Sequence, residues 1–306
     1  MKITKVVMSG ASGLIGSALA GQLTGAGIEV IKLVRRSARA SGEVTWDPTE
    51  PAGGLEHDVL AGADAVVHLS GAPLAGGRWT QARKAELRAS RITSTQTVVT
   101  AMVAAGGPPV LACGSAIGFY GCTGSQAADE GSPGGSGFLA DLVRDWEAAT
   151  KPAAAAGIRV VNLRSGVVLA PHGGMLGPLM LPFRLGLGAR IGAGTQYLSW
   201  ISLADEVGAI RFLLDSDDIF GPVNLTAPEP VTNAEFTAAL AKAVRRPALL
   251  QLPAPLVRAA LGELSAELLG SLRVKPAKLL EAGFEFRDPT VESALAAAVR
   301  AAHVPG

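Results

Sequence analysis

A glycine-rich turn near the N-terminus has the spacing of a pyrophosphate-binding motif. Its glycines recur at every third position because a tight turn and a close backbone approach to phosphate leave no room for a Cβ. The helix predicted to follow would present free N–H groups and its positive dipole end to the phosphates. The residues expected to contact a dinucleotide here are Gly10, Ala11, Ser12, Gly13, Leu14, Ile15 and Gly16.

Two adjacent arginines follow the next predicted strand, at the point that selects the nucleotide. Folds that prefer NAD end this strand on an acid that binds the ribose 2′-OH, about 20 residues after the motif. Here the positions are Val34, Arg35 and Arg36, and none is an acid. Because a guanidinium forms forked, charge-assisted hydrogen bonds with phosphate, we expect Arg35 to bind the 2′-phosphate of NADP and Arg36 to assist it. Two arginines that only solvate a strand end are the alternative.

These residues belong to an alternating series of strands and helices. Branched apolar residues predict a strand at 3–8, and apolar residues at helical spacing predict a helix from Leu14 that stops at Gly25. This alternation predicts an α/β fold of the Rossmann type, a doubly wound parallel sheet with helices on both faces. Further strands are expected at 29–34, 43–46, 65–69, 110–113 and 159–163, and long helices at 80–105 and 138–156.

The second half of the chain predicts a smaller lobe. Residues 171–198 are rich in Gly and Pro, and short helices are expected at 233–244, 255–261, 265–272 and 276–283. The expected division is an NADP-binding domain of residues 1–170 with 199–225, and a mostly helical lobe of 171–198 with 226–306. Segments 199–202 and 222–225 are expected to return to the sheet. A small-molecule substrate would bind between the two parts, beyond the carboxyl ends of the strands.

The composition limits the classes of partner. The chain has 306 residues, 48% hydrophobic and 17% charged, which is enough for a large core. A net charge of +1, with no long basic run, argues against a nucleic-acid partner. Two cysteines cannot form a disulfide framework and indicate a reducing compartment. Because no apolar run reaches about 20 residues and no signal-peptide pattern is visible, we expect a cytoplasmic protein with no membrane partner.

Motifs along the whole chain resemble the extended short-chain dehydrogenase/reductases, which include nucleoside-diphosphate-sugar epimerases. The glycine turn, the His68-Leu69-Ser70-Gly71 strand end and Tyr120-Gly121 are shared with them. The chain is most similar to an atypical branch, epimerase-family proteins of unknown function with a C-terminal domain of unknown function. The motifs typical of that branch are Arg78-Trp79, Ser90-Arg91-Ile92, residues 116–121, Asp145-Trp146-Glu147, residues 163–169, Leu181-Pro182-Phe183, Ser199-Trp200-Ile201 and residues 230–233.

The resemblance implies cofactor contacts outside the glycine turn. They are Asp47 for the adenine amino group, Leu69, Ser70 and Gly71 for the ribose, Glu86 and Arg91 on the long helix, and Val168 beside the nicotinamide. Two alternatives stay open. Asp47, which precedes a proline, also suits a solvated turn, and Glu86 with Arg91 also suits a solvated pair on a helix face.

The catalytic residues are where this chain departs from the family. Ordinary members use a Ser and a Tyr-x-x-x-Lys, in which Tyr transfers the proton and Lys lowers the pKa of that Tyr. Alignment with their helix places Phe138 at the Tyr position and Leu142 at the Lys position. Ser115 remains, and we expect it to hold the reacting oxygen. Tyr120 is the candidate for proton transfer, with a packed, hydrogen-bonded ring as its alternative role.

The sequence therefore predicts an NADP(H)-binding member of this atypical branch. One hypothesis is an oxidoreductase or a sugar-nucleotide epimerase with nonstandard acid–base groups. The other is a non-catalytic redox sensor or regulatory protein that responds to NADP(H) occupancy. No spacing among His, Cys and carboxylates suggests a metal site, and His68 is expected to be a packed core residue. The helices at 80–105 and 138–156 lie where extended members pair, which favours a homodimer over a monomer.

Overall fold

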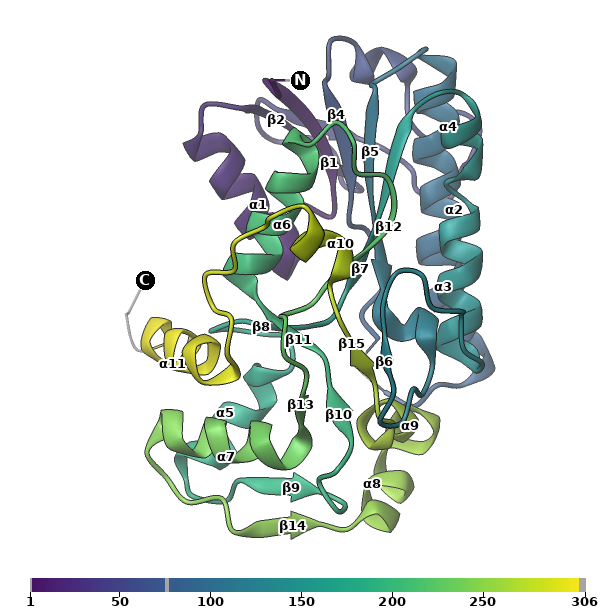
Figure 1. The fold of residues 1–306 in the computed structure, drawn as a ribbon. Coiled ribbons are helices and arrows are strands. Elements are labelled where there is room, and N and C mark those ends of the chain that lie inside the picture. Colours follow the sequence, from purple (N-terminus) through teal and green to yellow (C-terminus); the bar gives the residue numbers. More distant parts are fainter. Residues whose placement is uncertain (1, 75–76, 303–306) are drawn as a thin grey trace.

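A seven-stranded parallel sheet forms the centre of the molecule (Figure 1). The computed structural model describes residues 2–74 and 77–302. The strands lie in the order β12-β7-β5-β4-β1-β2-β3, so the predicted doubly wound Rossmann-type fold is confirmed. Their bounds are β1 (Lys5–Ser9), β2 (Glu29–Val34), β3 (Glu43–Thr45), β4 (Ala65–His68), β5 (Val110–Ala116), β7 (Arg159–Ser165) and β12 (Gly221–Leu225).

Helices cover both faces of this sheet, and alternate residues of each strand contact opposite helix layers. Val6 and Met8 pack with α1 (Leu14–Gly25) and α6 (Leu203–Asp215). Val7, between them, packs on the other face. That second layer consists of α2 (Gln81–Ala104), α3 (Phe138–Ala148) and α4 (Lys151–Ala155) (Figure 1).

The helix expected at 138–156 is two helices in the structure. α3 ends at Ala148, and α4 begins at Lys151 with Pro152 in its first turn. Pro152 has no N–H to donate to the oxygen of Ala148, so the hydrogen bonds of α3 cannot continue through it. The prediction of one continuous helix is therefore wrong at this proline, although both helices occupy the predicted range.

The segment at 199–202 leaves the central sheet. β11 (Trp200–Ser202) pairs in parallel with β8 (Val167–Leu169), whereas β12 takes the sheet edge beside β7. Trp200 is fully buried in the core of the smaller part, among residues of α5 (Leu176–Arg184), α7 (Asn233–Val244) and α11 (Val291–Ala301). The expected return of 199–202 to the sheet is wrong because this ring anchors the segment elsewhere. The expected return of 222–225 is confirmed.

The smaller part contains more elements than the sequence predicts. Helices α5 (Leu176–Arg184) and α11 (Val291–Ala301) were not expected, and both contribute to its core.

No helix in residues 2–74 and 77–302 is long and apolar enough to cross a membrane. The remaining elements are η1 (His57–Leu60), η2 (Ile117–Tyr120), β6 (Ala127–Ala128), β9 (Ala189–Ile191), β10 (Tyr197–Leu198), β13 (Val231–Thr232), α7 (Asn233–Val244), β14 (Leu250–Leu252), α8 (Ala254–Leu261), η3 (Gly262–Leu264), α9 (Ser265–Leu269), β15 (Arg273–Val274) and α10 (Ala277–Glu281).

Candidate functional site

Two glycines of the turn between β1 and α1 have no room for a side chain. A Cβ on Gly10, which has φ +69°, would lie 2.6 Å from the carbonyl of Leu69, and a Cβ on Gly16 would lie 2.2 Å from the Gly10 oxygen. Gly13 is the N-cap of α1, and no side chain caps that helix. The backbone therefore forms a cradle with free N–H groups at the carboxyl edge of the sheet, which fits a dinucleotide pyrophosphate.

The turn and the end of β4 lie against each other, as a shared cofactor site requires. The Leu69 N–H donates to the Ser9 oxygen at 3.3 Å, and the Gly10 backbone approaches both Leu69 and Ser70. The residues expected to contact the phosphates and those expected to contact the ribose are thus brought together. Their contacts with a cofactor stay predictions.

The two arginines after β2 have different surroundings. Arg36 is held by Glu43 of β3 through two hydrogen bonds of 2.6 and 2.8 Å. The Arg36 guanidinium and the Arg39 N–H lower the pKa of the Glu43 carboxyl to about 2, so this pair is charged at neutral pH. Arg35 is exposed and has no hydrogen bond or ion pair among the described residues. Of the two, Arg35 is therefore free to bind a phosphate.

Asp47 closes a turn of its own chain. Its carboxylate accepts from the Thr49 N–H at 2.8 Å and from the Thr49 hydroxyl at 2.6 Å. These hydrogen bonds lower the pKa of Asp47. The turn that was the alternative role of Asp47 is present, and an adenine contact would have to share this carboxylate.

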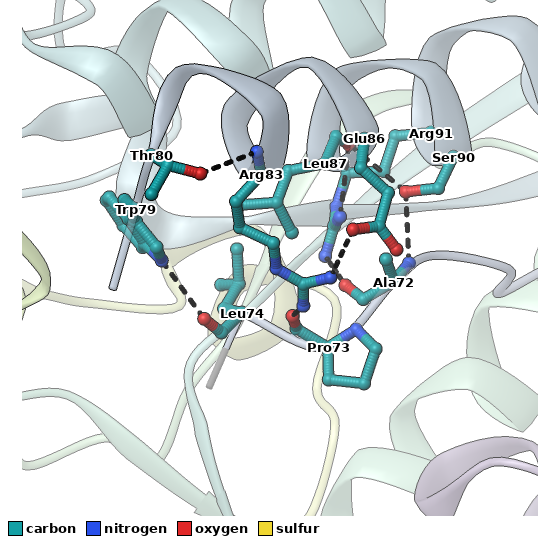
Figure 2. Close-up of polar contacts among 10 residues, drawn as sticks. All are labelled: Ala72, Pro73, Leu74, Trp79, Thr80, Arg83, Glu86, Leu87, Ser90 and Arg91. Atoms are coloured by element: carbon teal, nitrogen blue, oxygen red, sulfur yellow. Dashed lines mark hydrogen bonds and ion pairs between the residues drawn. The ribbon is translucent and has the colours of Figure 1, made fainter. Parts of the chain in front are cut away.

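Side chains of α2 hold the loop that follows Gly71 (Figure 2). The Ser90 hydroxyl accepts from the Ala72 N–H at 3.0 Å, and Arg91 donates to the Ala72 oxygen at 3.0 Å. Arg83 donates to the oxygen of Pro73 in the same loop. Three residues of one helix thus fix the backbone just beyond the expected ribose contacts.

Arg91 is buried under this loop and has no carboxylate partner among the described residues. Burial lowers the pKa of its guanidinium to about 10. A Cβ on Gly71 would lie 3.2 Å from the Arg91 Cζ, so the loop backbone sits directly on the guanidinium. Glu86 instead accepts from Arg83 at 2.6 Å (Figure 2). Glu86 and Arg91 therefore do not form the solvated pair that was considered from the sequence.

Ser115 and Tyr120, the two candidate catalytic residues, meet in one buried network. The Ser115 hydroxyl donates to Glu147 of α3 at 2.6 Å. Arg164 of β7 donates twice to the Glu147 carboxylate, at 2.7 and 2.8 Å, and once to the Tyr120 hydroxyl oxygen at 2.9 Å. The network lies on the α3 face of the sheet and connects β5, β7 and η2.

Tyr120 completes the network on its far side. Its hydroxyl donates to the Asn224 side chain at 2.8 Å, and its ring is 3% exposed. Burial raises the pKa of this hydroxyl despite the nearby Arg164. The surroundings match the alternative of a packed, hydrogen-bonded ring, with the Asn224 side-chain amide as the acceptor. In the sequence, Arg164 stands out only as a charged residue within an apolar strand.

Apolar packing surrounds the positions of the family's Tyr and Lys. Phe138 begins α3 and contacts Trp79 edge to face, with ring centroids 5.3 Å apart. Leu142, one turn later, is 1% exposed in a cluster with Leu87 and Leu139. Among the described residues, this cluster contains no titratable side chain.

A cavity of about 290 Å³ adjoins Phe138. It lies between the start of α3, the end of η2 and the η3–α9 segment, so residues of both expected parts line it. That a substrate binds there stays a prediction. Its charged lining residues are Glu263 and Glu267, and none of the lining residues that the structure describes is a lysine or an arginine. Glu263 pairs with Lys84, whose ammonium lies 5.2 Å from the centre of the Phe138 ring.

Two family models match this chain. The model of the NAD dependent epimerase/dehydratase family matches residues 6–225, and the model of a domain of unknown function, DUF1731, matches residues 252–298. Epimerase family protein Mb2239 of Mycobacterium bovis is 49% identical, over 95% of this chain and 96% of that protein. Epimerase family protein SDR39U1 of Homo sapiens is 36% identical, over 95% of this chain and 98% of that protein.

Solved structures with the same architecture include two at 34% sequence identity. The crystal structure of human epimerase family protein SDR39U1 (isoform2) with NADPH has a TM-score of 0.89 and covers 97% of this chain and 99% of that chain. The nucleoside-diphosphate sugar epimerase from Corynebacterium glutamicum has a TM-score of 0.79 and covers 97% of this chain and 58% of that chain.

Proposed function

The chain belongs to the NAD dependent epimerase/dehydratase family, and we propose that it binds NADP(H) and exchanges a hydride with a small organic molecule. The cofactor choice rests on one observation: Arg35 has no hydrogen bond or ion pair within the part of the chain that the structure describes, whereas the adjacent Arg36 is paired with Glu43. A free guanidinium at the end of β2 favours a ribose 2′-phosphate, which an acid at that position would repel. The human relative crystallised with NADPH supports the same choice.

The glycine cradle and the β4 end would hold this cofactor. Backbone N–H groups at the start of α1 would bind the pyrophosphate, apart from the Gly13 N–H, which already donates to the Gly10 oxygen at 2.9 Å. Leu69 and Ser70 would line the ribose, and Arg91 would keep their loop in place through Ala72. When bound, NADPH supplies a hydride to an acceptor at the carboxyl edge of the sheet.

The cavity beside Phe138 favours an oxidoreductase over a sugar-nucleotide epimerase. A sugar nucleotide carries two phosphates, and binding it calls for cationic side chains or helix N-termini. The α3 N-terminus lines the cavity, but its charged side chains are Glu263 and Glu267. Lys84 already neutralises Glu263, so the described lining offers a diphosphate no unpaired cation. A small carbonyl compound without phosphate fits the volume and the charge.

A redox-responsive binding protein without turnover is the second candidate. It is favoured by the hydroxyl groups of Ser115 and Tyr120, which are both bound inside the network of Glu147 and Arg164. Neither hydroxyl is free to hold a reacting oxygen in this arrangement. This candidate needs the cofactor site and no proton donor.

Cofactor titration tests the binding proposal. NADPH should bind more tightly than NADH, and Arg35→Ala should weaken NADPH binding by about 1.5–3 kcal/mol while leaving NADH binding unchanged. Arg36→Ala is the matched control, because its guanidinium is already occupied by Glu43. Equal affinities of the wild type for NADPH and NADH would refute the proposal.

A turnover assay separates the two candidates. The absorbance of NADPH is followed after addition of aldehydes, ketones or sugar nucleotides to the loaded protein. Consumption with a carbonyl compound and not with a sugar nucleotide supports the oxidoreductase. Tight NADPH binding without consumption supports the binding protein.

A further inference from the structure

A carboxyl group is buried at the carboxyl edge of the sheet, beside a half-buried hydroxyl. Glu206, in the first turns of α6, is fully buried, and its Oε1 lies 2.5 Å from the Ser165 Oγ. Its other oxygen, Oε2, has no hydrogen-bond partner among the described residues. A charged carboxylate in such a place would be strongly destabilised, because a single hydroxyl does not replace its hydration.

The position of Ser165 puts this pair on the side of the sheet that carries the glycine turn. Ser165 is the last residue of β7, in register with Ala116, the last residue of β5. Its neighbour Arg164 points to the α3 face, so the alternation of strand side chains directs Ser165 to the opposite face. That face is covered by α6 and α1, which pack against each other.

Among the described residues, no charged side chain forms an ion pair or a hydrogen bond with Glu206. Of the elements that pack most extensively against α6, which are α1, β5, β7, β8 and β11, only β7 contains charged residues. The 284–288 segment, which contacts α6 through Phe284 and Asp205, carries Glu285, Arg287 and Asp288. Arg164 faces α3, and Arg159 donates to carbonyls at the other end of α6, that of Leu213 among them. The preceding Asp205 accepts from backbone N–H groups of residues 287 and 288. Burial raises the pKa of Glu206 to about 8, so the group is neutral at pH 7.

We propose that Ser165 and Glu206 are a proton-donating pair for a carbonyl oxygen bound at this edge, in place of the absent Tyr and Lys. Neutral Glu206 donates from Oε1 to the Ser165 oxygen, which leaves the Ser165 hydroxyl free to donate to the ligand. This inference rests on the proposed NADP(H)-dependent function and names the proton source for it. Ser165 does not line the cavity beside Phe138, so the substrate carbonyl would extend from that cavity to the end of β7. There Ser165 would touch the substrate oxygen, and Glu206 would act through Ser165.

The proton transfers balance as follows. The carbonyl carbon gains the hydride and its π bond breaks, while the oxygen takes the proton of the Ser165 hydroxyl. The Ser165 oxygen takes the proton of Glu206 Oε1, and Glu206 is left as a carboxylate. Glu206 recovers its proton from water through Ser165 after the alcohol leaves. The reductant is NADPH, and one proton from water is consumed.

Infrared difference spectroscopy on the full chain tests the protonation state without turnover. The carbonyl stretch of a protonated carboxyl group should be present at pH 7, decrease with a midpoint near pH 8, and be missing in Glu206→Gln. Glu292→Gln, an exposed carboxyl on α11, is the control and should leave the band unchanged. A wild-type protein without this band, or a band that persists in Glu206→Gln, overturns the proposal.

Kinetics test the role of the pair. With NADPH and a panel of aldehydes and ketones, Ser165→Ala should lower the rate of NADPH oxidation about 100-fold or more. Glu206→Gln should remove the decline of the rate above pH 8, and NADPH affinity should stay within about twofold in both variants. Ser216→Ala, at the far end of α6, is the matched control.

Two results would overturn the proton-donating role of Ser165 and Glu206, and a third would refute the proposed function instead. Ser165→Ala with a wild-type rate refutes proton donation, and so does a wild type that binds NADPH but reduces no carbonyl compound. Failure of the wild type to bind NADPH refutes the proposed function itself. Thermal unfolding of each variant identifies a loss that comes from misfolding, and Glu206→Leu, which fills the same space without a proton, then replaces Glu206→Gln.

Discussion

Arg164 and Glu147 meet through two parallel hydrogen bonds beneath the carboxyl edge of the sheet, and the guanidinium is 3% exposed. The pair connects β7 with α3, and it fixes Ser115 and Tyr120, the residues that the sequence pointed to for catalysis. The Ser115 and Tyr120 hydroxyls therefore have a structural role in the site. The first prediction follows from this arrangement.

Removal of one partner of this pair should strongly destabilise the fold. Glu147→Ala leaves the Arg164 guanidinium buried without a counter-charge, and we expect a loss of about 3–5 kcal/mol in the free energy of unfolding. Asp141→Ala, which removes an exposed pair with Arg144 on the same helix, should cost about 1 kcal/mol or less. Urea unfolding of both variants measures the difference, and equal losses would contradict the prediction.

Stability should fall as the pH drops from about 6.5 to 4 because of His68. This imidazole is fully buried between the Ser9 and Ser94 hydroxyls, and burial lowers its pKa to about 4. His68 takes up a proton near pH 6.5 in the unfolded chain but only near pH 4 in the folded protein. The free energy of unfolding therefore falls by about 3 kcal/mol over this range. The loss is absent above pH 6.5 and complete below pH 4. Denaturation at several pH values, with His68→Gln as the variant without this slope, measures it.

A side chain at Gly16 should abolish NADPH binding, whereas a side chain at Gly21, further along the same helix, should not. In Gly16→Ala the new Cβ would lie 2.2 Å from the Gly10 oxygen, so the turn must move and NADPH binding should be lost. Gly21→Ala is the matched control on the same helix, because nothing lies within 4 Å of that Cβ. It should stabilise the protein by about 0.5–1 kcal/mol and leave NADPH binding unchanged. Loss of binding in Gly21→Ala would show that the helix itself is intolerant.

Of the two catalytic side chains that the family uses and this chain lacks, the Tyr should be tolerated at its position, but the Lys should not. Phe138→Tyr should fold normally, because Phe138 is half-buried beside the cavity. Leu142→Lys should destabilise the protein by about 3 kcal/mol or more, because an ammonium would replace a side chain that is 1% exposed. Thermal unfolding of the two single variants tests this contrast. A stable Leu142→Lys protein would show that the cluster can open to solvent.

Most of the fold could be predicted from local sequence patterns. The glycine turn and the apolar strands at 29–34, 65–69 and 110–113 each fit within a short window, and the sheet order follows from their alternation with helices. Trp200 shows the limit of such a window. Its flanking segment has strand character, and which sheet it joins depends on a core formed by helices up to 100 residues away.

The candidate site was less predictable because its polar groups are distant in the sequence. Arg36 was expected at a phosphate, but Glu43, seven residues later, lies on the adjacent strand and binds it. Ser115 and Tyr120 carry suitable groups, yet their roles depend on Glu147 and Arg164. The pair of Ser165 and Glu206 spans 41 residues, and only the packing of α6 on β7 brings the two side chains together.

The segment that the second family model covers is tied into the first by backbone pairing. β15 runs parallel to β6, Val274 packs in one cluster with Tyr120, and the Asn224 amide donates to the Lys275 oxygen. A gene fragment that ended near residue 225 would leave this strand edge and this amide uncovered in its product. The two segments therefore depend on each other for folding. If one segment is replaced by that of a relative, the residues of the other segment that contact it have to be replaced as well.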